Sequence, residues 1–161
     1  TEVKQEQENP KLFGDKIRSI HQLKKNKDFL IIARIESFIL NKPVRDALIR
    51  SSIYLKNGAD GIMIHDKDKS PKKILEFAKQ FRKKNKSAPL VSVPSSYNSI
   101  HEKELIKAGF NIVIYANHMF RASYPAMLNV AKSILKHGRS KEADRNMMSI
   151  KKILNLIPGT R

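Results

Sequence analysis

Residues 28–37 read Asp-Phe-Leu-Ile-Ile-Ala-Arg-Ile-Glu-Ser, an apolar run that ends in an arginine and a glutamate two positions apart. A continuous apolar run of this length is typical of a strand buried on both faces of a parallel sheet. Folds with such sheets place their binding sites at the carboxyl ends of the strands. Because side chains alternate along a strand, Arg34 and Glu36 are predicted to point the same way. The two side chains then either contact each other and a ligand, or lie in a polar, solvent-accessible opening at the end of the sheet.

Three further short apolar segments follow this run, at residues 61–65, 89–93 and 111–115. With residues 29–35 they predict four parallel strands, because helical patterns separate them. Four strand–helix units are too few to close an eightfold barrel, so the chain is either a small open α/β fold or the second half of such a barrel. Helices are predicted near residues 12–25, 43–57, from 70 onward, 99–109, 119–137 and 149–156, with a polar link over 141–146.

The composition is strongly basic, with a net charge of +17 over 161 residues. Taken alone, this charge suggests a nucleic-acid-binding module. The lysines, however, are spread over predicted helix faces, and no aromatic residues alternate with them to stack on bases. Solvated helix surfaces are therefore the favoured interpretation. The absence of cysteine excludes disulfides and thiolate metal sites.

The chain shows no targeting or membrane signal and no standard phosphate-binding loop. No apolar run approaches the roughly 20 residues that span a bilayer, and no signal peptide is visible, so a cytoplasmic protein without membrane contact is expected. Residues 1–11 are polar and are predicted to be a disordered or extended lead-in. Glycine-rich nucleotide motifs are absent. Glu36 stands alone at its strand end, so the sequence predicts no magnesium site built by this chain.

Polar side chains follow each predicted strand. Such groups converge at one edge of a parallel sheet, and an arginine, an imidazole, hydroxyls and an amide suit an anionic ligand. Each also has a structural interpretation. Arg34 and Glu36 can form an ion pair, a histidine after a strand is often only hydrogen-bonded, and serine or asparagine at these points can be a loop or cap residue. The candidates are Arg34, Glu36, His65, Ser95, Ser96, Tyr97, Tyr115, Asn117 and His118.

Four motifs in this order resemble the phosphoenolpyruvate mutase family of the isocitrate lyase superfamily. They are Ile-Ile-Ala-Arg-Ile-Glu-Ser at 31–37, Ala-Asp-Gly-Ile-Met-Ile-His at 59–65, Val-Pro-Ser-Ser-Tyr at 93–97 and Val-Ile-Tyr-Ala-Asn-His at 113–118. Residues 150–159 resemble the family's carboxyl-terminal end. The resemblance implies that residues 12–161 form the C-terminal half of a (β/α)8 barrel with a helical extension. The N-terminal half is absent from this chain, so the chain alone is expected to be inactive.

The resemblance also implies a reaction and roles for individual residues. The family interconverts phosphoenolpyruvate and phosphonopyruvate, an isomerisation used in phosphonate biosynthesis, with Mg²⁺ whose ligands lie in the absent half. Arg34 would hold the carboxylate or phosphoryl end of the substrate, and His65 would contact the transferring phosphoryl group. Ser95 and Ser96 would make weaker contacts to the substrate. Glu36 and Asn117 would orient the site.

Alternatives within the superfamily remain open. Phosphonopyruvate hydrolase shares the arginine and histidine pattern, and the loop that separates it from the mutase lies in the absent half. Carbon–carbon lyases such as 2-methylisocitrate lyase tend to have Arg-Thr-Asp, a glutamate and Asn-x-Thr-Glu at the first three strand ends. This chain has Arg34-Ile35-Glu36, then His65, then Val93-Pro94-Ser95-Ser96. These departures favour a phosphonate enzyme.

The last predicted helix suits packing against a neighbour. Ile150, Ile153, Leu154 and Ile157 form one apolar face. In the family this helix is exchanged between the subunits of dimers, and those dimers pair. The resemblance therefore implies a homo-oligomer of this kind, although packing of the helix on its own barrel would use the same face.

Overall fold

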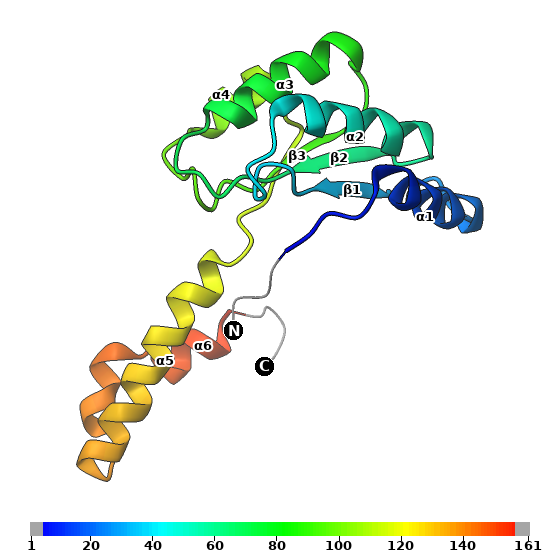
Figure 1. The fold of residues 1–161 in the computed structure, drawn as a ribbon. Coiled ribbons are helices and arrows are strands. Elements are labelled where there is room, and N and C mark those ends of the chain that lie inside the picture. Colours follow the sequence, from blue (N-terminus) through cyan, green and yellow to red (C-terminus); the bar gives the residue numbers. More distant parts are fainter. Residues whose placement is uncertain (1–4, 157–161) are drawn as a thin grey trace. The chain divides into compact units, whose positions relative to one another are not determined.

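A computed structural model describes residues 5–156 and divides the chain into two compact units. The first unit ends at Ala116 and contains the sheet, and the second begins at Asn117 and is helical (Figure 1). Within residues 5–156 no helix combines the length and the apolar character needed to cross a membrane.

The first unit is built on a parallel sheet of four strands in the order β1-β2-β3-β4. Arg34 of β1 is level with Met63 of β2, and Met63 is level with Val91 of β3. The four predicted parallel strands are thus confirmed. The strands are β1 (Ile32–Ile35), β2 (Gly61–Ile64), β3 (Leu90–Ser92) and β4 (Ile112–Val113), and the helices are α1 (Pro10–Leu23), α2 (Val44–Lys56), α3 (Lys72–Lys84) and α4 (Glu102–Ala108).

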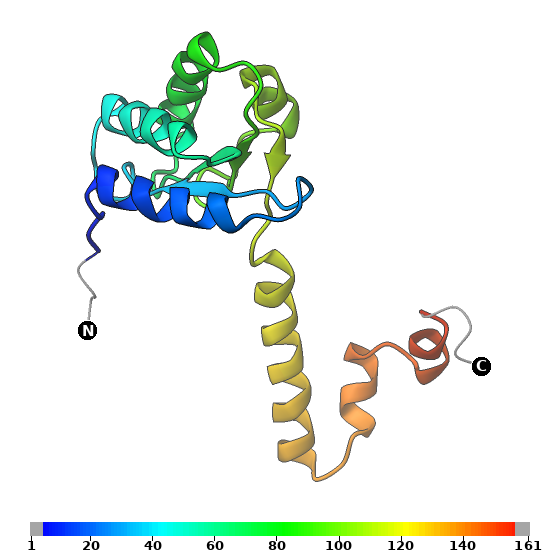
Figure 2. The same cartoon turned by 90° about the vertical axis from the view of Figure 1, so that its right-hand side faces the viewer.

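Consecutive helices pack on one another and cover one face of the sheet. Both views show α2 and α3 on the same side of β1 (Figures 1 and 2). Ala33 and Ile35 of β1 are buried in the core with Ile62 and Ile64 of β2, whereas Arg34 between them is exposed. Since strand side chains alternate, Arg34 and Met63 share the face that the core does not occupy.

The first strand differs from its prediction at its amino end. β1 begins at Ile32, and Phe29 and Leu30 are 61% and 49% exposed. A turn occupies the preceding residues, because the Asp28 N–H donates to Asn26 Oδ1 at 2.9 Å and the Phe29 N–H donates to the Asn26 carbonyl. The prediction of a strand buried on both faces is therefore wrong for residues 29–31 and for the exposed side of Arg34.

Local chemistry sets the helix ends. The Asn9 side chain accepts hydrogen bonds from Lys11 N and Leu12 N, so α1 begins at Pro10, before the predicted residue 12. The capping box of α4 joins His101 and Glu104, so this helix begins at Glu102 rather than at the predicted residue 99. Two helices, α2 and α4, end at a glycine shortly before a strand: Gly58 and Gly109 have φ values of 98° and 96°, which other residues adopt only with strain.

The second unit contains α5 (His118–His137), a 3₁₀ helix η1 (Lys141–Asn146) and α6 (Ile150–Leu154). The segment predicted as a polar link is thus a 3₁₀ helix, which packs on α5 and buries Ala143. Of the predicted apolar face on the last helix, Ile150, Ile153 and Leu154 lie on α6, whereas Ile157 is outside the described residues.

An ion pair between Lys24, which follows α1, and Asp60, which precedes β2, makes the stability of the fold depend on pH. Asp60 accepts hydrogen bonds from Lys24 Nζ at 2.9 Å and from the Ile31 N–H at 2.7 Å. Burial alone would raise the pKa of Asp60, but these two bonds lower it below its usual value. Because the pKa of Asp60 is lower in the folded than in the unfolded chain, its ionised form stabilises the fold at pH values above the unfolded-state pKa. This stabilisation is lost as the pH falls through the folded-state pKa.

Asp60→Asn is therefore expected to lower the free energy of unfolding at pH 7 by about 1–2 kcal/mol, and to lower it much less at pH 2–3. Urea titrations at the two pH values measure this difference. Asp15→Asn is the control, because that carboxylate is 48% exposed and is expected to change stability little. An equal loss at both pH values would contradict the role of the charge.

Candidate functional site

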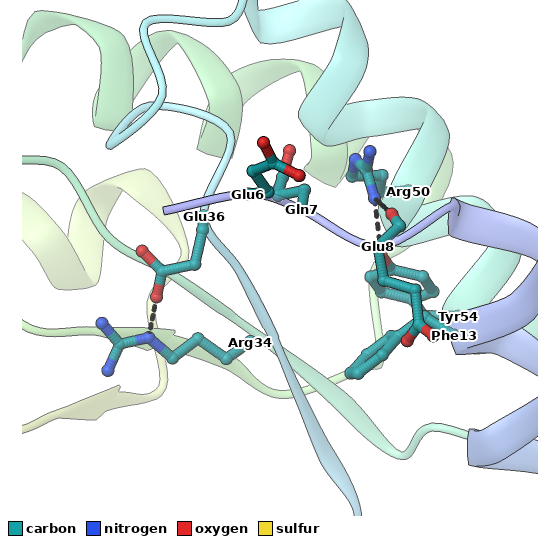
Figure 3. A pocket seen from close by; sticks show the side chains of 8 residues that line it. All are labelled: Glu6, Gln7, Glu8, Phe13, Arg34, Glu36, Arg50 and Tyr54. Atoms are coloured by element: carbon teal, nitrogen blue, oxygen red, sulfur yellow. Dashed lines mark hydrogen bonds and ion pairs between the residues drawn. The ribbon is translucent and has the colours of Figure 1, made fainter. Parts of the chain in front are cut away.

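Arg34 and Glu36 meet at the carboxyl end of β1. The Arg34 Nε–H donates to Glu36 Oε1, and the two form an ion pair (Figure 3). The Arg34 side chain remains 53% exposed and that of Glu36 31% exposed, so solvent or a ligand can reach the guanidinium. A guanidinium held by one carboxylate oxygen keeps other N–H groups for an anion. Both predicted interpretations, an ion pair and a ligand contact, are compatible with this geometry.

A cavity of about 250 Å³ lies beside this pair. Figure 3 shows the lead-in residues Glu6, Gln7 and Glu8 passing across it. The cavity therefore combines the exposed guanidinium with a strand edge and a segment of chain that precedes α1. Its lining residues are Glu6, Gln7, Glu8, Phe13, Arg34, Glu36, Arg50 and Tyr54.

Arg50 of α2 fixes the lead-in to the fold. Only 5% of the residue is exposed, and its Nη1 donates to the Glu8 carbonyl at 2.9 Å and to Tyr54 Oη at 3.1 Å. Its Nε donates to Asp46 Oδ2 at 3.1 Å. Burial lowers the pKa of Arg50, but the bonds to Tyr54 and Asp46 outweigh this and raise it. Arg50 thus stays charged and holds one wall of the cavity.

His65 directly follows β2 and is half-buried. Arg34 is level with Met63 in the sheet, and His65 follows Met63 by two residues, just past the end of β2. Its Nδ1 atom is buried and has no hydrogen-bond partner within residues 5–156. A buried ring nitrogen without a partner is costly, which makes this atom a candidate for a ligand contact.

Ser95 and Ser96 lie in the loop after β3 and line a second cavity of about 560 Å³ with residues of the loop after β2. Two lysines, three serines and one asparagine form this lining: Lys67, Lys69, Ser95, Ser96, Asn98 and Ser99. We call it the lysine–serine cavity. It was not predicted as a unit, because two separate loops contribute its residues.

Tyr97 is wholly buried rather than part of the open edge. Its hydroxyl is 3.0 Å from Ser92 Oγ of β3. Burial raises the pKa of the Tyr97 phenol, and the negative charge of Asp66 adds to the rise. Asp66 is also fully buried: its Oδ1 accepts the Asp68 N–H at 3.0 Å, and its Oδ2 has no partner within the described residues.

The structure thus brings Arg34 and Glu36 into contact and places His65 directly after the neighbouring strand β2. Ser95 and Ser96 belong to the next loop along the sheet. Asn117 is the first residue of the second unit and caps α5 without a side-chain cap bond. Tyr115, another predicted strand-end group, donates its hydroxyl to Glu102 at 2.7 Å.

The described residues do not fit a magnesium site by themselves. Within residues 5–156 no three histidine, aspartate or glutamate side chains gather closely enough to hold a metal ion. Glu36 is paired with Arg34, and Asp66 offers only one buried oxygen without a partner. Magnesium needs near-octahedral oxygen coordination, which these described residues do not supply.

Two features of the site were missed from the sequence. Arg50 shares a helix face with the buried residues Ala47 and Tyr54, and lies four positions after Asp46, so its burial and its pairing could have been predicted from that spacing. Lys67 and Lys69 carried no such signal, because exposed lysines are common and their meeting with Ser95 depends on how two loops fold.

Known proteins with similar sequences indicate the family of this chain. Residues 2–135 match the protein family described as Phosphoenolpyruvate phosphomutase. A phosphonopyruvate hydrolase from Variovorax sp. (strain Pal2) is 36% identical over 159 residues, which make up 97% of this chain and 53% of that protein. This chain spans about half the length of the curated relatives it matches.

Solved structures give the same picture. The structure of a phosphoenolpyruvate phosphomutase from Streptomyces platensis subsp. rosaceus is 32% identical, with a TM-score of 0.86 over 96% of this chain and 53% of that chain. A phosphonopyruvate hydrolase in complex with oxalate and Mg²⁺ is 34% identical, with a TM-score of 0.84 over 96% of this chain and 55% of that chain.

Proposed function

Because this chain belongs to the phosphoenolpyruvate phosphomutase family, we propose that it forms half of an active site that interconverts phosphoenolpyruvate and phosphonopyruvate. The observation that carries the proposal is Arg34, whose exposed guanidinium is held by Glu36 at the carboxyl end of β1. His65 on the neighbouring strand end supplies a buried ring nitrogen without a partner within residues 5–156. Both groups suit a phosphorylated carboxylic acid.

Phosphoryl transfer depends mainly on positioning and on stabilisation of the charge on the phosphoryl oxygens. Arg34 would bind the anionic end of the substrate, and Glu36 would keep the guanidinium in one orientation. His65 would contact the transferring phosphoryl group. Ser95 and Ser96 would add hydroxyl contacts from the loop after β3.

Magnesium would balance the charge of the phosphoryl oxygens when it is bound. A related hydrolase has been solved with Mg²⁺ and oxalate, which supports the same ion here. The described residues gather no metal-binding cluster, so the ligands would have to come from outside residues 5–156. The 161-residue chain alone is accordingly expected to show no turnover.

Hydrolysis of phosphonopyruvate is the second candidate reaction. The observation in its favour is the 36% identity to the Variovorax phosphonopyruvate hydrolase over 97% of this chain. Arg34 and His65 would bind the substrate in either reaction. The two reactions differ in whether the phosphoryl group moves to the enol oxygen of pyruvate or to water.

Self-association through the second unit is also part of the proposal. On α6, Ile150, Ile153 and Leu154 are 78%, 54% and 56% exposed. Large apolar side chains grouped in this way are typical of an interface. Exchange of this helix between two subunits, with pairing of the resulting dimers, would cover them.

Phosphorus NMR of the complete protein that carries this chain, incubated with phosphonopyruvate and Mg²⁺, tests the reaction. A growing phosphoenolpyruvate signal is the expected result. A signal of inorganic phosphate without phosphoenolpyruvate would replace the mutase with the hydrolase. A folded protein that leaves phosphonopyruvate unchanged would overturn both candidates. The 161-residue chain, assayed alone, provides the comparison.

A further inference from the structure

The lysine–serine cavity contains many hydrogen-bond donors that the protein does not use. The side chains of Lys67, Lys69, Ser95, Ser96, Asn98 and Ser99 form no hydrogen bond or ion pair with other residues in the described part of the chain. No carboxylate lines the cavity. Two ammonium groups and several hydroxyls without partners attract an anion, because charge-assisted hydrogen bonds are the strong ones.

Each of the two loops that form the cavity contains a buried residue next to its lining residues. Asp66 precedes Lys67, is fully buried, and holds the loop in a turn by accepting the Asp68 N–H at 3.0 Å. Tyr97 follows Ser96 and is also fully buried, with its hydroxyl 3.0 Å from Ser92 Oγ. Loops fixed in this way present their donors with less loss of entropy when a ligand binds.

Nearby carboxylates do not cancel the two lysines. Asp68 accepts the Ser70 N–H at 3.2 Å and lies 3.9 Å from Lys73 Nζ, so another lysine already offsets its charge. Asp66 is fully buried and does not line the cavity. The cavity also lies in the loops that follow β2 and β3, the edge of the sheet that carries His65.

From these contacts we infer that the lysine–serine cavity is an additional anion subsite, which binds a small phosphorylated or phosphonate carboxylic acid through Lys67 and Lys69 and shares the Ser95 and Ser96 hydroxyls with the proposed substrate site. The identity of this ligand rests on the proposed function, whereas the affinity for an anion does not. The cavity of about 560 Å³ falls within the range of roughly 300–1,000 Å³ that small-molecule sites occupy.

Isothermal titration of the complete protein with inorganic phosphate tests the site. Lys67→Gln combined with Lys69→Gln should weaken phosphate binding at least about tenfold, because both charged donors are lost. Lys79→Gln combined with Lys83→Gln removes the same charge from the exposed face of α3 and should leave binding unchanged. Arg34→Ala should retain phosphate binding, since Arg34 does not line this cavity.

In the enzyme assay, the Lys67/Lys69 variant should raise KM for phosphonopyruvate about tenfold with kcat within twofold, the pattern of lost uniform binding. Equal weakening of phosphate binding by both double variants, or no weakening by either, would overturn the site. If the complete protein shows no turnover but the Lys67/Lys69 variant still loses phosphate binding, the anion site stands and the proposed function is rejected.

Discussion

Arg34→Ala is expected to lower turnover of phosphonopyruvate by the complete protein about 10²–10³-fold, while the free energy of unfolding changes by less than about 0.5 kcal/mol. The guanidinium is the only group of the Arg34–Glu36 pair that can bind an anion, and it stands at the carboxyl end of β1. Its side chain is 53% exposed, so its removal leaves no cavity in the core.

The assay is the phosphorus NMR measurement described above, with a urea titration of the same preparations. Arg45→Ala is the matched control, because Arg45 is exposed on α2 and does not line the cavity beside Arg34. Arg34→Lys keeps the charge but loses the forked geometry, and should recover only part of the rate. Turnover of Arg34→Ala near that of the unaltered protein would remove Arg34 from the site.

The parallel sheet was predictable because its strands follow a simple rule. Each is a short apolar run preceded by a helix, and both helices before β2 and β4 end at glycines with positive φ. The predicted fold, half of a (β/α)8 barrel with a helical extension, is confirmed by the strand order and by the related solved structures. Strand ends were less predictable, since Phe29 and Leu30 are apolar yet precede β1 in a turn.

The site was predictable where it depends on one strand and less so where it depends on two loops. Alternation along β1 was sufficient to predict that Arg34 and Glu36 point the same way, and they form an ion pair. Tyr97 was predicted among the polar groups at the strand ends, but it is buried, and so is Asp66, which the sequence did not single out. Their burial depends on tertiary packing beneath the sheet edge, and the sequence pattern carries no information on that packing.

The open face of the sheet explains why the site in this chain is only half enclosed. Arg34 and Met63 lie on the face that the core does not occupy, and β1 and β4 are the edge strands among the described residues. Polar groups on an uncovered face bind an anion weakly, because water competes for the same donors. Additional protein over that face would strengthen each of these contacts, which is the arrangement that the proposed function requires.

A large loss of stability is expected from a residue that contributes no chemistry. Arg50→Met should lower the free energy of unfolding by about 3 kcal/mol, because it removes a buried charge whose partners then lack a cation. Asp46 would keep only its bond from Ser37 Oγ, and the Tyr54 hydroxyl and the Glu8 carbonyl would each lose a donor. Methionine fills a similar volume, so the loss would come mainly from unpaired polar groups rather than from a cavity.

Urea titration measures this loss, with Arg45→Met as the control for the same change at an exposed position of α2. The control should unfold within about 0.5 kcal/mol of the unaltered protein. Hydrogen exchange should also speed up at Gln7 and Glu8, because Arg50 Nη1 fixes this segment across the cavity beside Arg34. If Arg50→Met and Arg45→Met unfold alike, the Arg50 network does not hold the lead-in, and that wall of the cavity must be fixed by Phe13 packing on Tyr54.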